Sequence, residues 1–229
     1  MNTLLISCMD RRLNSIIDKQ NNQSTIILRN AGANVEGLSN SITSMLNAHN
    51  ISKIILMPHT DCGAMKVVYG AIKNGIKPSN EIYDRLVKQF VKSSFSNLEE
   101  LEEINRHMQN ESLSKISRGI KIEEQYIDLK NQNPEENEEH ILVFTYPSGK
   151  KYEDICKSLG VKISNVYFIH ASSIEEVQPD IDIAINNLHI KKVVFLAIEP
   201  SEYRNMFAEM KRAVLKGFMQ KASVEFRKI

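Results

Sequence analysis

The feature that most constrains the fold is a series of short, uninterrupted apolar runs separated by helical patterns. Residues 3–7 and 53–58 are predicted to be buried strands, and residues 24–33 a strand that ends in a Gly-containing loop, because their apolar side chains are consecutive rather than alternating. Residues 39–50 have apolar side chains at helical spacing, and residues 59–75 are predicted to form a turn that opens into a helix. Strand, helix and strand in alternation predict an α/β fold with a parallel β-sheet core flanked by helices.

The second part of the chain repeats this order of elements. Residues 80–133 are polar and favour helix, and the acidic, Pro-containing stretch 131–140 is the predicted boundary after them. Residues 165–206 then show strand, loop, helix, strand and loop in the order found at 25–65. Because any two β-α-β units share that order, the internal repeat is a hypothesis. The expected division is a first half with a helical extension, a linker and a degenerate repeat half, at residues 1–133, 134–140 and 141–229.

Composition bounds the class of protein and its partners. A hydrophobic content of 42% in 229 residues is sufficient for a buried core, and no apolar window approaches the roughly 18 residues of a membrane span. The formal net charge of +1 argues neither for nor against binding to nucleic acid or to a membrane, and we expect neither partner. Three cysteines without a visible export signal favour reduced thiols and a cytoplasmic location.

The C-terminal residues have an amphipathic helical pattern. Phe207, Met210, Val214 and Phe218 recur at helical spacing, with Lys and Arg between them. We expect this helix to pack on the sheet with its basic face in solvent. Binding of the helix to a membrane surface is the alternative.

Reactive side chains follow two of the predicted strands directly. Cys8, Asp10 and Arg12 occupy alternate positions after the first strand, which would place them on one side of an extended segment. His59 and Cys62 follow the strand at 53–58. Neighbouring parallel strands end at the same edge of a sheet, so these side chains can meet there, and two thiolates with an imidazole suit zinc. Taken singly, a buried Cys is commonly a small hydrophobe, and a lone His is usually a core or surface group.

These residues belong to three motifs that together resemble those of β-class carbonic anhydrases. The motifs are Cys-x-Asp-x-Arg at 8–12, Arg-Asn-Ala-Gly-Ala at 29–33 and His-Thr-Asp-Cys-Gly-Ala at 59–64. The resemblance implies a zinc ion held by Cys8, His59 and Cys62, with Asp10 and Arg12 as a catalytic dyad beside the fourth zinc position. It also implies a parallel sheet and an intertwined dimer with active sites near the subunit interface.

The reaction implied by the resemblance is the reversible hydration of carbon dioxide to bicarbonate by zinc-bound hydroxide. Asp10 would accept a hydrogen bond from the hydroxide, and Arg12 would hold Asp10 ionised and in place. Gly63 is expected to bring the backbone close to the site and to contact substrate, and Gly32 to form a tight turn nearby. An ordinary strand-to-helix turn is the alternative for both glycines. Asp61 is expected to be a helix-start residue rather than a second base.

The second half lacks this zinc set. In the sequence alignment of the halves, Thr145 stands at the position of Cys8, and Ile198 and Ser201 stand at those of His59 and Cys62. We therefore expect a single-chain pseudo-dimer, either a monomer or a homodimer of such chains, in which one half keeps the metal. Cys156 lies in a helical pattern and is expected to be structural.

Two other functions stay open at this stage. One is hydrolysis of a related small molecule, such as carbonyl sulfide or carbon disulfide, at the same metal. The other is a non-catalytic, zinc-stabilised protein with a binding role. Retention of Asp10 and Arg12 favours an enzyme, because a purely structural zinc needs a closed fourth ligand and no dyad.

Overall fold

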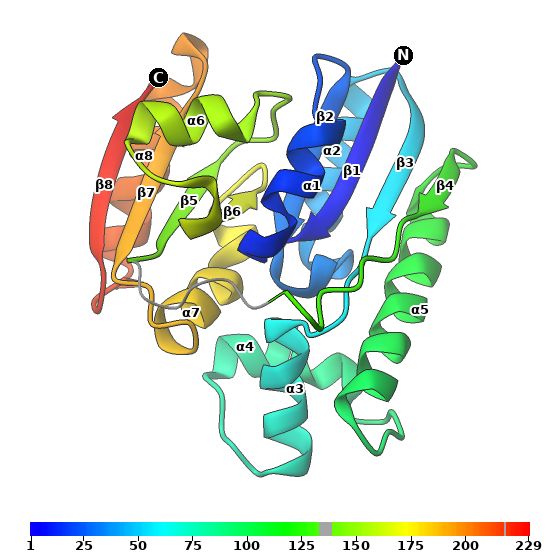
Figure 1. The fold of residues 1–229 in the computed structure, drawn as a ribbon. Helices are drawn as coiled ribbons and strands as arrows, with labels where there is room; N and C mark the ends of the chain where they lie inside the picture. The colour runs from blue at the N-terminus through cyan, green and yellow to red at the C-terminus, as the bar shows by residue number, and fades with distance from the viewer. Residues whose placement is uncertain (133–138, 218) are drawn as a thin grey trace.

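One eight-stranded sheet runs through both halves of the chain, in the order β4-β3-β1-β2-β6-β5-β7-β8 (Figure 1). The computed structural model describes residues 1–132, 139–217 and 219–229. All neighbouring strands are parallel except β2 and β6, which meet antiparallel with Arg29 opposite His170. The strands are β1 Asn2–Cys8, β2 Thr25–Asn30, β3 Ile51–Met57, β4 Lys121–Glu124, β5 Ile141–Thr145, β6 Val166–His170, β7 Lys192–Ala197 and β8 Ser223–Lys228. The predicted α/β class is confirmed.

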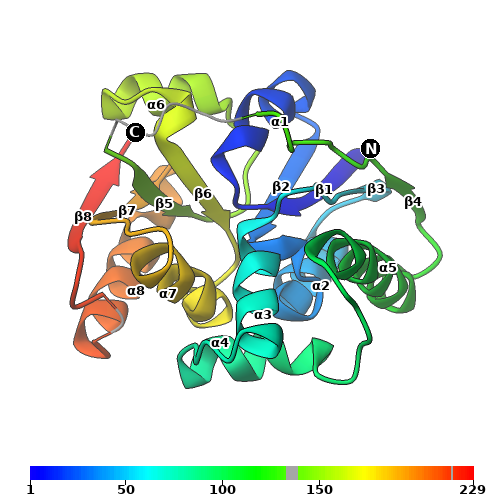
Figure 2. The same ribbon diagram turned by 60° about the horizontal axis from the view of Figure 1, so that its bottom comes forward.

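Helices cover both faces of the sheet (Figure 2). One face carries α1 (Asn14–Gln20) and α6 (Tyr152–Leu159), and the other carries α2 (Ser39–Ala48), α5 (Leu98–Ile116), α7 (Gln178–Asn186) and α8 (Tyr203–Leu215). The helices α3 (Gly63–Lys73) and α4 (Asn80–Arg85) lie beyond the carboxyl ends of β1 and β3 (Figure 1). Short 3₁₀ turns occupy Arg11–Leu13, Ala31–Ala33, Glu36–Leu38, Val87–Phe90, Ile163–Asn165, Glu175–Val177 and Pro200–Glu202. Among the described residues, no helix is long and apolar enough to cross a membrane.

The C-terminal helix lies against the sheet as predicted (Figure 2), but only part of its predicted apolar face is buried. Helix α8 ends at Leu215 and buries Met206 and Ala213, whereas Phe207 and Val214 of the predicted apolar face are 40% and 50% exposed. Phe218 lies outside the described residues. The last residues form β8, an edge strand whose alternating apolar and charged side chains are typical of a half-buried strand. The predicted linker at 134–140 also lies mostly outside the described residues.

The two halves pair their strands in the same way. The contacts of β5 with β6 and β7, and of β7 with β8, repeat those of β1 with β2 and β3, and of β3 with β4. Ser7 lies opposite Arg29 and Met57, while Thr145 lies opposite His170 and Leu196. Thr145, which the sequence alignment sets at the position of Cys8, is the last residue of β5, as Cys8 is the last residue of β1. It lies opposite the last residue of β6, as Cys8 lies opposite the last residue of β2.

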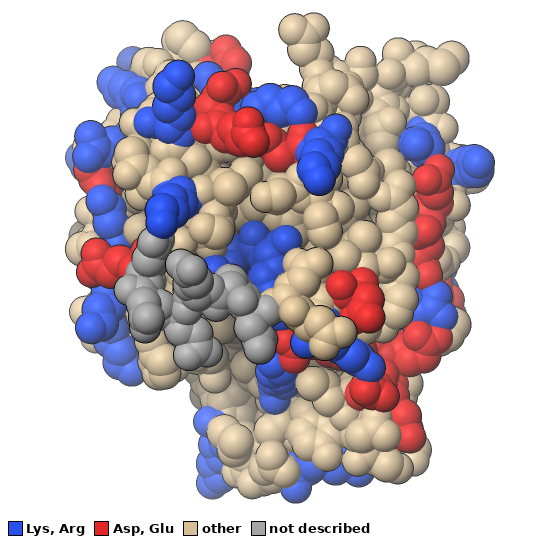
Figure 3. Space-filling view, in the orientation of Figure 1, with Lys and Arg blue, Asp and Glu red and all other residues tan. Residues whose placement is uncertain are grey.

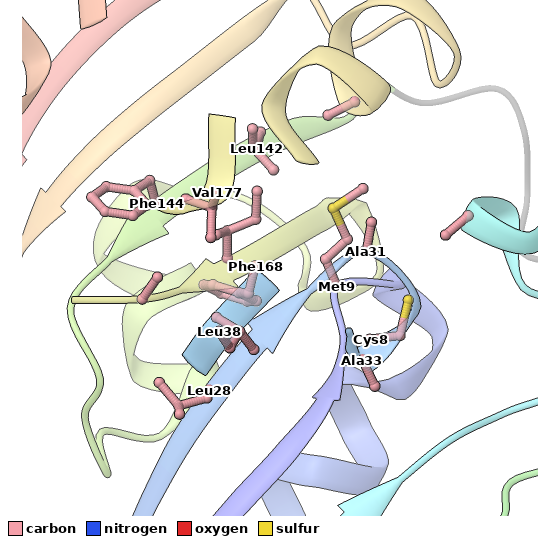
Figure 4. Packing of buried hydrophobic residues seen from close by; sticks show 14 of the residues in the cluster. Cys8, Met9, Leu28, Ala31, Ala33, Leu38, Leu142, Phe144, Phe168 and Val177 are labelled. Atoms are coloured by element: carbon pink, nitrogen blue, oxygen red, sulfur yellow. The ribbon is translucent and has the colours of Figure 1, made fainter. Parts of the chain in front are cut away.

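The halves share one hydrophobic core. Figure 4 shows Leu28 and Leu38 of the first half packed near Phe168 and Val177 of the second, and all four are fully buried. Polar contacts also cross between the halves. The Glu176 carboxylate accepts hydrogen bonds from the N–H and the hydroxyl of Ser41. The second half is thus held against the first by specific contacts as well as by apolar packing.

Candidate metal centre

Three potential metal ligands converge at the carboxyl edge of the sheet. Cys8 is the last residue of β1, and His59 and Cys62 stand in the loop between β3 and α3. A ligand atom of each lies within 4.8 Å of the others, and all three residues are buried. The neighbouring strand ends therefore bring together the residues that the sequence places far apart, as predicted.

The chemistry of these side chains fits a bound zinc ion. The His59 Nδ1 lies 2.8 Å from the carbonyl oxygen of Thr60, which assigns the proton to Nδ1 and leaves a lone pair on Nε2. That Nε2 is buried and has no hydrogen-bond partner among the described residues. A buried acceptor without a partner is costly, so this nitrogen is disposed to bind a cation. With two cysteine sulfurs beside it, the set has the N and S ligands that zinc prefers.

The two thiols are coupled to each other. A hydrogen bond from Cys62, assisted by the nearby His59, lowers the pKa of Cys8 well below its usual value. The same hydrogen bond, together with burial, raises the pKa of Cys62. The backbone N–H of Gly32 also donates to the Cys8 sulfur at 3.3 Å. The site thus favours a thiolate at Cys8.

Asp10 and Arg12 form a two-point ion pair next to the ligands. The Arg12 Nε lies 3.0 Å from Asp10 Oδ1, and Nη2 lies 2.7 Å from Oδ2. Burial alone would raise the pKa of Asp10, but the hydrogen bond from Arg12 and the positive charge of Arg12 lower it below its usual value. The expected pair is present, although the reason given for it was wrong. Residues 11–13 form a 3₁₀ turn that folds Arg12 back onto Asp10, so the segment is not extended.

Arg29 fixes the backbone of this segment, a role that sequence reasoning did not assign. Its fully buried guanidinium donates to the carbonyl oxygens of Cys8 and Asp10, each at 2.8 Å, and to Asn14 Oδ1 at 2.6 Å. These bonds hold residues 8–10 so that their side chains face the site. The signal in the sequence was the Arg-Asn-Ala-Gly-Ala motif, which begins in the last two residues of β2.

Asp180 of the second half reaches the same centre through the backbone. Its Oδ1 accepts a hydrogen bond from the N–H of Ala31 at 2.6 Å, and the next residue is the Gly32 that donates to Cys8. Gly32 has a φ of 73°, which favours glycine, and an added Cβ would lie 3.3 Å from Met65. The turn beside the Cys8 sulfur is therefore held by a carboxylate 149 residues away in the sequence.

Asp180→Asn is expected to change how stability depends on pH. Burial raises the pKa of Asp180 to about 7, well above the value near 3.9 of an unfolded chain. Folding therefore takes up a proton at Asp180, and this contribution to stability is lost as the pH rises between these two values. Between about pH 4.5 and 7.5, the free energy of unfolding of the parent should fall by about 3 kcal/mol relative to the variant. Urea unfolding of both proteins at these pH values measures the difference, and parallel pH profiles would contradict it.

A cavity of about 320 Å³ opens onto the centre and is walled by both halves. Cys8, Asp10, Arg12 and Gly63 line it from the first half. Tyr167, Ile183 and Leu188 line it from the second half. An added Cβ at Gly63 would meet Leu188 at an ordinary 3.9 Å. Figure 3, in the orientation of Figure 1, shows Lys and Arg atoms gathered in a hollow near the middle of the visible face. The cavity is lined by three cationic side chains, those of Arg11, Arg12 and Lys66.

Comparisons with known proteins bear on the same residues. The family model described as carbonic anhydrase matches residues 3–140. Among solved structures, the chain is similar to the β-carbonic anhydrase CafA of the fungal pathogen Aspergillus fumigatus, with 16% identity and a TM-score of 0.43 over 57% of this chain and 72% of that chain. No curated protein matches the chain significantly. The family match spans Cys8, Asp10, Arg12, His59 and Cys62.

Proposed function

Because the chain belongs to the β-carbonic anhydrase family, we propose that it is an enzyme that hydrates carbon dioxide reversibly to bicarbonate, with a zinc ion held by Cys8, His59 and Cys62. The observation that carries the proposal is the Asp10 carboxylate, ion-paired with Arg12 in the cavity that Cys8 also lines. Stopped-flow measurement of carbon dioxide hydration by the zinc-loaded protein tests it. An absence of hydration in protein shown to contain zinc would contradict it.

The three candidate ligands, Asp10 and Arg12 have different roles in the proposed reaction. Zinc bound at the three ligands would supply a Lewis acid that makes hydroxide available near neutral pH. Asp10 offers only acceptor oxygens, and Arg12 uses both lone pairs of Oδ1 but only one of Oδ2. The remaining lone pair of Oδ2 leaves Asp10 free to accept one further hydrogen bond and so to orient a hydroxide that the metal would supply for attack on carbon dioxide.

The same residues bear on the alternatives. Carbonyl sulfide or carbon disulfide would need the same hydroxide and the same small cavity, so turnover assays with these molecules are the test for that substrate class. A protein that uses zinc only for stability has no need of an ion-paired carboxylate beside the metal. The arrangement of Asp10 and Arg12 therefore favours catalysis over a purely structural zinc.

We divide the chain into a first half at residues 1–133 and a second half at residues 141–229. In our proposal the second half takes the place of a partner subunit. Its repeated strand pairing and its antiparallel contact through β2 and β6 support this interpretation. It also supplies Tyr167, Ile183 and Leu188 to the cavity. Such a pseudo-dimer is complete as a monomer and is compatible with a homodimer. We also propose a cytoplasmic location, which the three free thiols support.

Leu188→Asn tests whether the second half lines the substrate pocket. The amide would replace an apolar wall and retain water there, so kcat/KM for carbon dioxide is expected to fall about tenfold with zinc content unchanged. Leu159→Asn is the matched control, because Leu159 of α6 is also partly buried against the core but does not line the cavity. Equal kcat/KM values in the two variants would contradict a role of Leu188 in the pocket.

A further inference from the structure

Arg12 has a second carboxylate partner besides Asp10. Its Nη1 lies 2.7 Å from Asp61 Oδ2, and its Nη2 donates to the backbone oxygen of Asp61 at 2.8 Å. Asp10 and Asp61 thus bind neighbouring edges of one guanidinium group. The Arg12 side chain is only 11% exposed, so water has little access to replace a lost partner.

Asp61 is held in place from three directions. Its φ of 57° lies in the left-handed region, and its carboxylate contacts Arg12. Lys66 Nζ lies 2.6 Å from Asp61 Oδ1. The buried Glu102 accepts a hydrogen bond from the N–H of Cys62 at 2.7 Å and another from the N–H of Asp61. The turn that carries two metal ligands therefore also aims a carboxylate at the dyad.

The sequence expectation for Asp61 was wrong for this reason. Helix α3 begins at Gly63 with Cys62 as its N-cap residue, and Asp61 lies one residue earlier. Its carboxylate oxygens bind Lys66 and Arg12 rather than the backbone N–H groups of the helix. Glu102 belongs to α5, so the polar helical extension also contributes to the centre.

We propose that Asp61 is a positioning residue that keeps Arg12 in its two-point contact with Asp10. The long Arg12 side chain has many rotamers, and a single carboxylate would leave Nη1 without an ionic partner. With Asp61 in place, both ends of the guanidinium are fixed, and Asp10 keeps the orientation that the proposed function requires. The catalytic part of this inference rests on that proposed function, whereas the effect on Arg12 does not.

Asp61→Asn and Asp61→Gly test the proposal. Both residues tolerate a positive φ, so the turn is preserved while the carboxylate charge is removed. The first readout is hydrogen exchange of the Arg12 Nε–H, followed by NMR and assigned by its loss in Arg12→Lys. In the parent this group is bonded to Asp10 Oδ1. Its exchange is expected to accelerate about tenfold or more in both variants, because a hydrogen bond between charged groups is weakened.

The second readout is kcat for carbon dioxide hydration, which should fall about tenfold with zinc content unchanged. Asp84→Asn, an exposed change on α4, is the control for both readouts. Unchanged exchange in both Asp61 variants would overturn the positioning role, whatever the activity. Faster exchange in a protein that does not hydrate carbon dioxide would support the positioning role and contradict the proposed function, so the two failures are distinguishable.

Discussion

Asp10→Asn is expected to slow carbon dioxide hydration about 100-fold or more while zinc stays bound. The amide has one acceptor oxygen and one N–H₂ donor, whereas Arg12 presents donors to both oxygens of Asp10. One arm of the guanidinium would then face another donor, and the two-point contact would be lost. The amide would also lack the negative charge of the Asp10 carboxylate, so it would be a weaker acceptor for the O–H of the hydroxide.

Stopped-flow hydration assays and metal analysis of the same samples measure this effect. Asp84→Asn serves as the control, because Asp84 is an exposed residue of α4 outside the cavity lining. Loss of rate with full zinc content would assign Asp10 to the reaction itself. If Asp10→Asn bound zinc and kept the parental rate, the dyad would have no part in catalysis, and a stabilising role for the metal would be favoured.

The ligand cluster could be predicted from the sequence because each ligand follows an apolar strand. Once β1 and β3 are recognised as parallel neighbours, their carboxyl ends must meet, and Cys8, His59 and Cys62 lie at those ends. The same logic predicted the α/β class, because consecutive apolar residues mark strands that are covered on both faces. These inferences need only local patterns and the general geometry of parallel sheets.

The supporting contacts could not be predicted in this way. Asp180 and Glu102 reach the centre from distant helices. Nothing near them in the sequence indicates which backbone N–H groups donate hydrogen bonds to their carboxylates. The 3₁₀ turn at Arg12 depends on the side chain of Asp10, which accepts a hydrogen bond from the backbone N–H of Arg12. All of these are tertiary relationships that periodicity does not encode.

His59→Gln is expected to abolish both activity and stabilisation by zinc. In the parent, metal binding would satisfy the unpaired, buried Nε2 of His59, so the folded state should bind zinc far more tightly than the unfolded chain. At free zinc about 1,000-fold above the dissociation constant, this contributes about 4 kcal/mol to stability and raises Tm. Removing zinc with a chelator should lower the Tm of the parent correspondingly.

The variant should show no such response. Even a lost outer-shell partner weakens metal binding 10–100-fold, so loss of one of three protein ligands should exceed about 100-fold. Thermal unfolding of parent and variant, with added zinc and with chelator, measures this directly. His107→Gln is the control, because the His107 side chain on α5 is 69% exposed and lies outside the ligand cluster. A parent whose Tm ignores zinc and chelator would contradict the metal site itself. A zinc response that persists in His59→Gln would show instead that the cysteines bind the metal without this histidine.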